Sequence, residues 1–162
     1  MTPPENQQHA LAALHDTVYE AAAHFRIVHP DLFDGYHTAH DVLAHLTFWM
    51  CEHVRVAQAL VDGTVPDLRE ESIPALNRAA CAASSGDSMG QLVDDLLARY
   101  EKLDALLRQL PDWSISFPIK ASSQACTVDD RIFGLTAHLH YHVTTLRRSA
   151  FAYPELSLAQ PA

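Results

Sequence analysis

The chain has 162 residues, of which 48% are apolar and 19% charged, so it can bury a hydrophobic core as one domain and is not a disordered tail. Its 20 acidic residues outnumber its 11 lysines and arginines, which gives a net charge of −9. This charge argues against nucleic-acid binding, because a surface that follows phosphates needs clustered lysine and arginine.

The first two predicted helices span residues 5–28 and 38–61, where apolar side chains recur at steps of three and four. Pro30 ends the first helix, because the residue before a proline avoids the helical conformation. Thr38 and Asp41 match a capping box, which satisfies two free amide groups at the start of the second helix.

Two further helices are predicted over residues 88–110 and 128–151 by the same apolar repeat. Each follows a capping box, the first at Ser88 and the second at Thr127. Pro111 ends the first of these two helices.

Two long connections complete the chain. Residues 62–87 are too many for a bare loop, and Ser72 followed by Ile73-Pro74 predicts the start of a short helix. Residues 111–126, here called the strap, alternate apolar residues with breaks, which predicts an extended segment across the bundle. The expected fold is therefore an all-α, antiparallel four-helix bundle that forms one domain over residues 1–162.

The cysteines and the first residues indicate the compartment. Cys51, Cys81 and Cys126 are widely spaced and odd in number, so we expect free, small buried side chains rather than disulfides or a thiolate zinc site. The first residues lack the pattern of a signal peptide, and no apolar run is long enough to span a bilayer. We expect a cytoplasmic protein that binds no membrane.

Histidine is unusually frequent: its 11 residues equal all lysines and arginines together. In the last helix, His138 and His142 are four residues apart and share the face of Leu139, whereas His140 points the opposite way. Buried imidazoles need partners for their ring nitrogens, and two imidazoles at this spacing can converge on one cation. His45, on the buried side of the second helix, is the natural third member.

If the second and fourth helices face the same space, His45, His138 and His142 would bind a divalent transition metal and leave an open coordination position. A structural role stays open, because hydrogen-bonded core histidines are common and a step of four is ordinary helix spacing. A rival cluster with His37 and His40 is disfavoured, since a step of five turns His40 away from His45. We interpret five others as surface or half-buried residues: His9, His15, His24, His29 and His53.

Three residues are predicted to line a pocket beside this trio. Glu52 follows His45 by two helical turns and could act as a partner or base, with an ordinary exposed glutamate as the alternative. Trp49 and Tyr141 are the predicted aromatic lining, although aromatic residues on bundle helices also serve as plain core.

The same histidines carry a resemblance to a known family. Residues 38–49 read TAHDVLAHLTFW, which resembles the second helix of the DinB-like four-helix bundle superfamily. Residues 135–148 read LTAHLHYHVTTLRR and resemble its fourth helix, which carries an HxxxH ligand pair. Residues 73–80, IPALNRAA, resemble a short insert of some members.

The resemblance implies a metal-dependent enzyme whose triad maps onto His45, His138 and His142. Relatives include transferases and isomerases that use mycothiol, bacillithiol or glutathione. Some members follow the last histidine with Arg-Gly-Gln, whereas this chain has Val143-Thr144-Thr145, which indicates a divergent branch.

The resulting functional prediction is an enzyme for a small-molecule substrate, with zinc or nickel activating water or a low-molecular-weight thiol. It would act as a hydrolase or as a thiol S-transferase or isomerase, and we expect a homodimer. Two alternatives stay open: a stress-related binding or dimerisation module without catalysis, and a metal-free hydrolase whose histidines act as acid and base.

Overall fold

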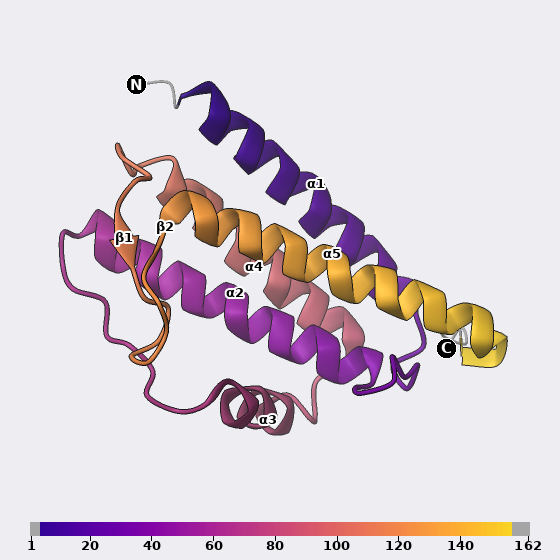
Figure 1. Ribbon diagram of the computed structural model, residues 1–162. Coiled ribbons are helices and arrows are strands. Elements are labelled where there is room, and N and C mark those ends of the chain that lie inside the picture. Colours follow the sequence, from indigo (N-terminus) through magenta and orange to yellow (C-terminus); the bar gives the residue numbers. More distant parts are fainter. Residues whose placement is uncertain (1–3, 157–162) are drawn as a thin grey trace.

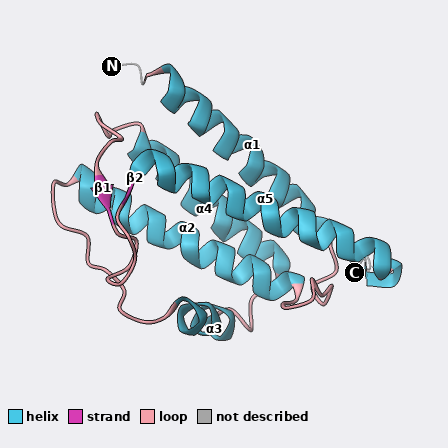
Figure 2. Ribbon diagram, viewed as in Figure 1, coloured by secondary structure: helices cyan, strands magenta, loops and turns pink. Residues whose placement is uncertain are grey.

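Four long helices form the body of the molecule: α1 (Glu5–Ile27), α2 (Ala39–Val61), α4 (Met89–Leu107) and α5 (Val128–Ala152) (Figure 1). The computed structural model describes residues 4–156. A shorter helix, α3 (Ile73–Ala83), lies beside α2 in the connection between α2 and α4 (Figure 2). Strands β1 (Ser116–Phe117) and β2 (Cys126–Thr127) pair antiparallel, and a 3-10 turn follows α5 at Pro154–Leu156. The predicted bundle, with its extra helix and strap, is confirmed.

Local hydrogen bonds set the helix starts that the sequence indicated. Ser88 and Thr127 each form a complete capping box, and the Thr38 hydroxyl accepts the backbone N–H of Asp41 at 3.1 Å. Ser72 caps α3 in the same way, and a proline occupies the first turn of that helix. The largest difference from the predicted boundaries is in α4, which ends at Leu107 because the next three residues form a turn before Pro111.

The helices α1 and α4 run antiparallel. Arg26 of α1 pairs with Asp94 at 2.6 Å, while Tyr19, earlier in α1, meets Tyr100, later in α4, with ring centroids 6.1 Å apart. The helices α2 and α5 are also antiparallel: His45, near the start of α2, lies beside His142, late in α5, whereas Leu60, near the end of α2, lines a cavity together with Val128, at the start of α5.

The other two neighbouring pairs run parallel. In α2 and α4, His40 lies 2.9 Å from the carbonyl oxygen of Asp87, and Thr47, further along α2, lies 3.5 Å from that of Leu92. The reason is the connection of residues 62–88, which runs back along the bundle so that α4 begins at the same end as α2 (Figure 1). The helices α1 and α5 are likewise parallel.

The core lies between the four long helices. Every one of them contributes side chains that are completely or almost completely buried; among the largest are Phe25, Leu43, Met50, Leu96, Leu103, Ile132, Leu139 and Leu146. Among the four neighbouring pairs, α2 and α5 approach each other least closely. This gap leaves room for polar side chains in the interior.

The strap closes one end of that gap. Trp113 is buried, and its indole N–H donates to the carbonyl oxygen of Leu107 at 3.2 Å. Arg131 of α5 donates to the carbonyl oxygens of Phe117 and Gln124 at 3.0 and 3.1 Å. The strap is thus bound to both helices that it joins.

Within residues 4–156, no helix combines the length and the apolar character that crossing a bilayer would require.

Candidate metal centre

Three histidine side chains from α2 and α5 meet inside the gap between these helices. Nε2 of His142 lies 3.1 Å from Nε2 of His45 and 3.1 Å from Nε2 of His138. One ring nitrogen from each residue lies within 4.8 Å of those of the other two. His45 and His142 are buried, and His138 is half-buried on the side of a pocket. The structure therefore brings together the trio that the spacing singled out.

Burial keeps these imidazoles uncharged. It lowers the pKa of His45 to about 3, with smaller contributions from the neighbouring His142 and His138, and a backbone hydrogen bond to Asp41 opposes the shift. It likewise lowers the pKa of His142 to about 4, and it lowers the pKa of His138. Near neutral pH each ring is therefore neutral and has one nitrogen with a free lone pair, as a metal ligand requires.

The trio does not form a closed hydrogen-bond network by itself. Nε2 of His142 faces two other Nε2 atoms, and a neutral nitrogen has either one proton or one lone pair, so it can satisfy one neighbour but not both. In a tetrahedral site with bonds of 2.0–2.1 Å, ligand nitrogens lie about 3.3 Å apart. The two distances of 3.1 Å are close to that value, so the trio could bind a divalent transition metal.

Asp34 stands behind His142, in the loop before α2. Its Oδ1 accepts the backbone N–H groups of Tyr36 and His37, both at 2.8 Å, while its Oδ2 lies 3.9 Å from Nδ1 of His142. That Nδ1 is buried and makes no hydrogen bond to the described residues, and the Asp34 side chain is only 4% exposed. The carboxylate is thus positioned to orient His142, as acidic residues behind metal-bound histidines do.

Sequence reasoning missed Asp34. The Asp34-Gly35 pair signals a turn, and Gly35 indeed has φ of 103°, but nothing in the spacing relates this turn to a histidine of the last helix.

The rival histidine cluster does not form. His40 contacts the carbonyl oxygen of Asp87 at 2.9 Å, on the side of α4. His37 is exposed, and its ring centroid lies 6.1 Å from that of His45, so it stands at the edge of the trio. Its charge would further lower the pKa values of His45 and His142.

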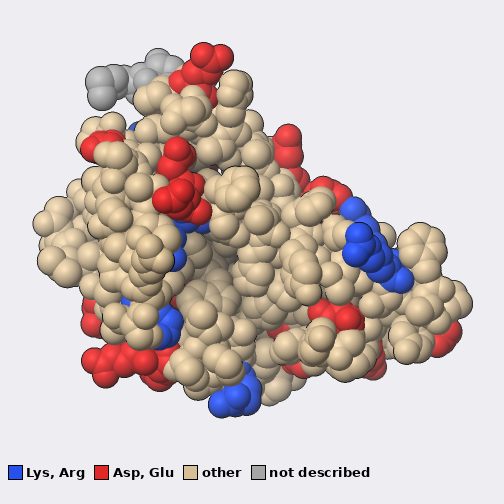
Figure 3. Space-filling model, in the orientation of Figure 1, with Lys and Arg blue, Asp and Glu red and all other residues tan. Residues whose placement is uncertain are grey.

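A pocket of about 380 Å³ opens beside His138. Its walls come from α2, α3, the strap and α5, and Trp49 forms part of them. The Trp49 indole N–H donates to Oδ1 of Asn77 at 2.8 Å, which ties α3 to α2 across the pocket. Figure 3 shows a hollow on this face of the molecule, bordered by basic and acidic side chains.

The two other predicted lining residues are Glu52, in α2, and Tyr141, in α5. Glu52 is 2% exposed rather than solvated, and its carboxylate accepts from Arg55 at 2.7 Å and from Arg69 at 2.9 Å. Burial raises its pKa, but the two arginines outweigh that effect, and the net shift is downward. Tyr141 is 57% exposed, with its ring 5.2 Å from that of His142. The pocket-lining roles of both residues stay predictions.

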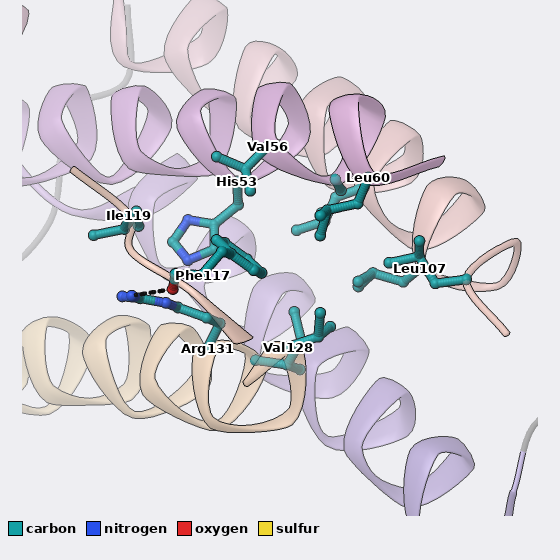
Figure 4. Close-up of a pocket in the computed structure, with 12 residues that line it drawn as sticks. His53, Val56, Leu60, Leu107, Phe117, Ile119, Val128 and Arg131 are labelled. Carbon is teal, nitrogen blue, oxygen red and sulfur yellow. Dashed lines mark hydrogen bonds between the residues drawn. The ribbon is translucent and has the colours of Figure 1, made fainter. Parts of the chain in front are cut away.

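His53 is the second residue that sequence reasoning undervalued. It lines the pocket beside His138 and also a narrow apolar cavity between α2, α4, α5 and the strap (Figure 4). Its Nδ1 lies 2.8 Å from the carbonyl oxygen of Trp49, which can only accept, so Nδ1 carries the proton and Nε2 the lone pair. Burial lowers the pKa of His53 to about 4, and the charge of Arg131 adds to this shift.

No family model and no curated protein matches this chain. Among solved structures, it is similar to a mycothiol-dependent maleylpyruvate isomerase, with a TM-score of 0.71, 14% identity, and coverage of 86% of this chain and 60% of that one. A histidine-to-alanine mutant of a mycothiol-dependent maleylpyruvate isomerase matches with a TM-score of 0.68, at the same identity and coverage. The chain thus spans 60% of the length of the structures that it matches. At this identity the similarity concerns the fold alone, and this chain shares the four-helix-bundle fold of these structures.

Proposed function

We propose that this protein is a metal-dependent enzyme in which His45, His138 and His142 bind a divalent transition metal, with zinc and nickel as the candidates. The observation that carries the proposal is the convergence of three neutral imidazoles, with two Nε2 separations of 3.1 Å, in the interior of the bundle. Buried ring nitrogens without hydrogen-bond partners destabilise the folded protein, and a cation bound to them would remove this penalty.

A divalent cation in this position lowers the pKa of a bound water or thiol and so makes hydroxide or thiolate available near neutral pH. The protein groups around it have separate tasks. Asp34 orients His142, and the half-buried His138 joins the trio to the pocket where a second reactant would bind. Trp49 and Leu135 supply apolar walls that exclude water from that reactant. No nucleophilic side chain is required.

The choice of nucleophile decides the reaction class. Hydroxide would make the protein a hydrolase, and a low-molecular-weight thiolate would make it an S-transferase or isomerase. The matched solved structures are of a mycothiol-dependent isomerase, which favours the thiol. A pocket of about 380 Å³ suits a small-molecule substrate, and a net charge of −9 disfavours nucleic acid.

We also propose that the enzyme is a cytoplasmic homodimer. All three cysteines are free, as expected in a reducing compartment, although they are half-buried and not buried as the sequence predicted. Phe133 and Phe151 of α5 are 77% and 90% exposed, and such side chains often become buried in a subunit interface. The strap is a weaker candidate for that interface, because Trp113 packs into the core. Sedimentation analysis should give twice the chain mass of 18.0 kDa.

Metal analysis of protein purified without an affinity tag tests the metal site. We expect close to one divalent ion per chain, a lower melting temperature after chelation, and loss of both properties in His45→Ala. The matched control is His140→Ala, on the exposed face of α5, which should keep the metal. Low metal content, a melting temperature insensitive to chelator and wild-type behaviour of His45→Ala would together refute the proposal.

A thiol assay then separates the two reaction classes. Metal-loaded protein is incubated with glutathione or another small thiol and a model electrophile, and thiol consumption is followed. Metal-dependent consumption supports the transferase or isomerase. Absence of any thiol dependence removes that class and leaves the hydrolase.

A further inference from the structure

Arg131 is a half-buried cation that lacks a carboxylate partner. Its Nη2 donates to the carbonyl oxygen of Phe117 (Figure 4) and to that of Gln124. Its guanidinium carbon lies 5.6 Å from the centre of the Phe117 ring. Its Nε is buried and makes no hydrogen bond to the described residues. Six other arginines in the described part of the chain form ion pairs with carboxylates: Arg26, Arg55, Arg69, Arg99, Arg108 and Arg147.

The nearest acidic residue in sequence, Asp130, lines the same pocket and interacts electrostatically with Arg131, but the two side chains form no ion pair. Oδ2 of Asp130 accepts from the backbone N–H and the hydroxyl of Thr127, at 3.2 and 2.8 Å, so this carboxylate is committed to the start of α5. Both hydrogen bonds that Arg131 donates to carbonyl oxygens use Nη2, so the two N–H groups of Nη1 have no partner among the described residues.

Arg131 lies in the wall of the pocket that reaches the proposed metal site. Arg131, Gly134, Leu135 and His138 all line this pocket, and their spacing of three, four and seven places them on one face of α5. Seven residues correspond to about 10 Å along a helix axis. The positive charge of Arg131 and the imidazole of His138 therefore lie at opposite ends of the pocket wall that α5 forms.

Gly134, between them, leaves space in that wall. Glycine destabilises a helix interior relative to alanine, so its presence inside α5 calls for a reason. The backbone gives none, since Gly134 does not have a positive φ. Packing gives none either, because a Cβ atom built on Gly134 would meet no atom within 4 Å. What the missing side chain does provide is open volume beside Arg131.

We propose that this pocket binds a small carboxylate with an apolar body, with the carboxylate on Arg131 and the body against Trp49, Gly134 and Leu135. The free Nη1 group of Arg131 can donate a charge-assisted hydrogen bond to a carboxylate oxygen, and a partly desolvated arginine gains more from such a contact than a solvated one. The inference rests on the proposed function only for the role of this ligand as the substrate that meets the activated water or thiol.

Metal-free protein titrated with phenylacetate and with its neutral analogue phenylacetamide tests the proposal. The readout is the indole N–H resonance of Trp49, which lies in the pocket wall and is one of only two tryptophans. We expect phenylacetate to shift this resonance and to bind about tenfold or more tightly than the amide. Arg131→Gln should abolish this preference, and Gly134→Leu should abolish binding of both compounds while the protein stays folded.

Two variants on exposed positions of the same helix serve as controls, Arg148→Gln for charge and Ala137→Leu for volume, and both should bind phenylacetate as the wild type does. If Arg131→Gln does not fold, the comparison of acid with amide and the Gly134→Leu variant decide. No shift with phenylacetate, or equal affinity for the amide, overturns the proposal. Because the titration needs no metal, a protein with the carboxylate site but no metal site would give binding here and fail only the metal analysis.

Discussion

Asp34 illustrates how a single residue outside the helices can govern a site built on them. Two backbone N–H groups fix one of its carboxylate oxygens at 2.8 Å, so the other oxygen has a defined position 3.9 Å from Nδ1 of His142. Burial lowers the pKa of His142 to about 4, and Asp34 opposes this shift, which makes the imidazole a better electron donor than burial alone would.

At this scale we predict that Asp34→Asn weakens zinc binding. The amide keeps the shape but loses the charge behind His142, and changes of this kind reduce metal affinity by roughly 10–100-fold. Competition with a chromogenic chelator measures the affinity. Asp31→Asn, in the same loop but exposed, should leave it unchanged. Equal zinc affinity of wild type and Asp34→Asn would mean that the carboxylate serves only the loop.

At the scale of elements, the gap between α2 and α5 determines where polar groups can lie, and the strap determines how one end of it is closed. Trp113 anchors the strap: it is 3% exposed, and its N–H bonds the carbonyl oxygen at the end of α4. The backbone N–H of Val128, the first residue of α5, lies 3.1 Å from the carbonyl oxygens of both Trp113 and Ile115. The start of α5, and with it Arg131, is thus positioned by the strap.

We therefore predict that Trp113→Ala destabilises the protein by about 3–5 kcal/mol, as expected for loss of a buried tryptophan. Urea unfolding followed by circular dichroism gives the free energy. Ile115→Ala, at a strap position that is 36% exposed, should cost clearly less. Similar losses in the two variants would show that Trp113 is not the anchor.

At the scale of the whole molecule, buried neutral histidines make stability depend on pH. Burial lowers the pKa of His45 to about 3 and those of His53 and His142 to about 4, from 6.5 for an unperturbed histidine. Between pH 6.5 and about 4 the unfolded chain therefore binds protons that the folded chain does not. The free energy of unfolding is therefore highest above pH 6.5 and decreases as the pH falls toward 4.

Metal-free protein should accordingly unfold at lower urea concentration with each step from pH 7 to pH 4.5, with a limiting slope of about 1.4 kcal/mol per pH unit for each such histidine. His53→Gln, outside the trio, should make the dependence shallower. The reference is His9→Gln, an exposed position in α1. A midpoint that does not change over this pH range would contradict the neutral, buried state of these rings.

The helices and the trio could be predicted because their signals are local. Ser88 and Thr127 cap the helices that follow them, and His138 and His142 share a face through the helix repeat alone. The contribution of Asp34, the burial of Glu52 and the parallel course of α2 and α4 depend on contacts between distant segments. Helical periodicity carries no information about such contacts, so these features required the structure.

One consequence concerns folding. His45 and His142 are 97 positions apart, so a metal shared by them would close a loop that contains most of the chain. If the metal stayed bound to the unfolded chain, this long loop would remove more conformational freedom than a short one. Metal that binds only the folded chain adds stability that grows with the logarithm of its free concentration above Kd. The helix α5 carries two of the three histidines and approaches α2 less closely than it approaches α1, so the metal would give it a second attachment to the bundle. Amide hydrogen exchange in α5 is therefore where metal release should first become visible.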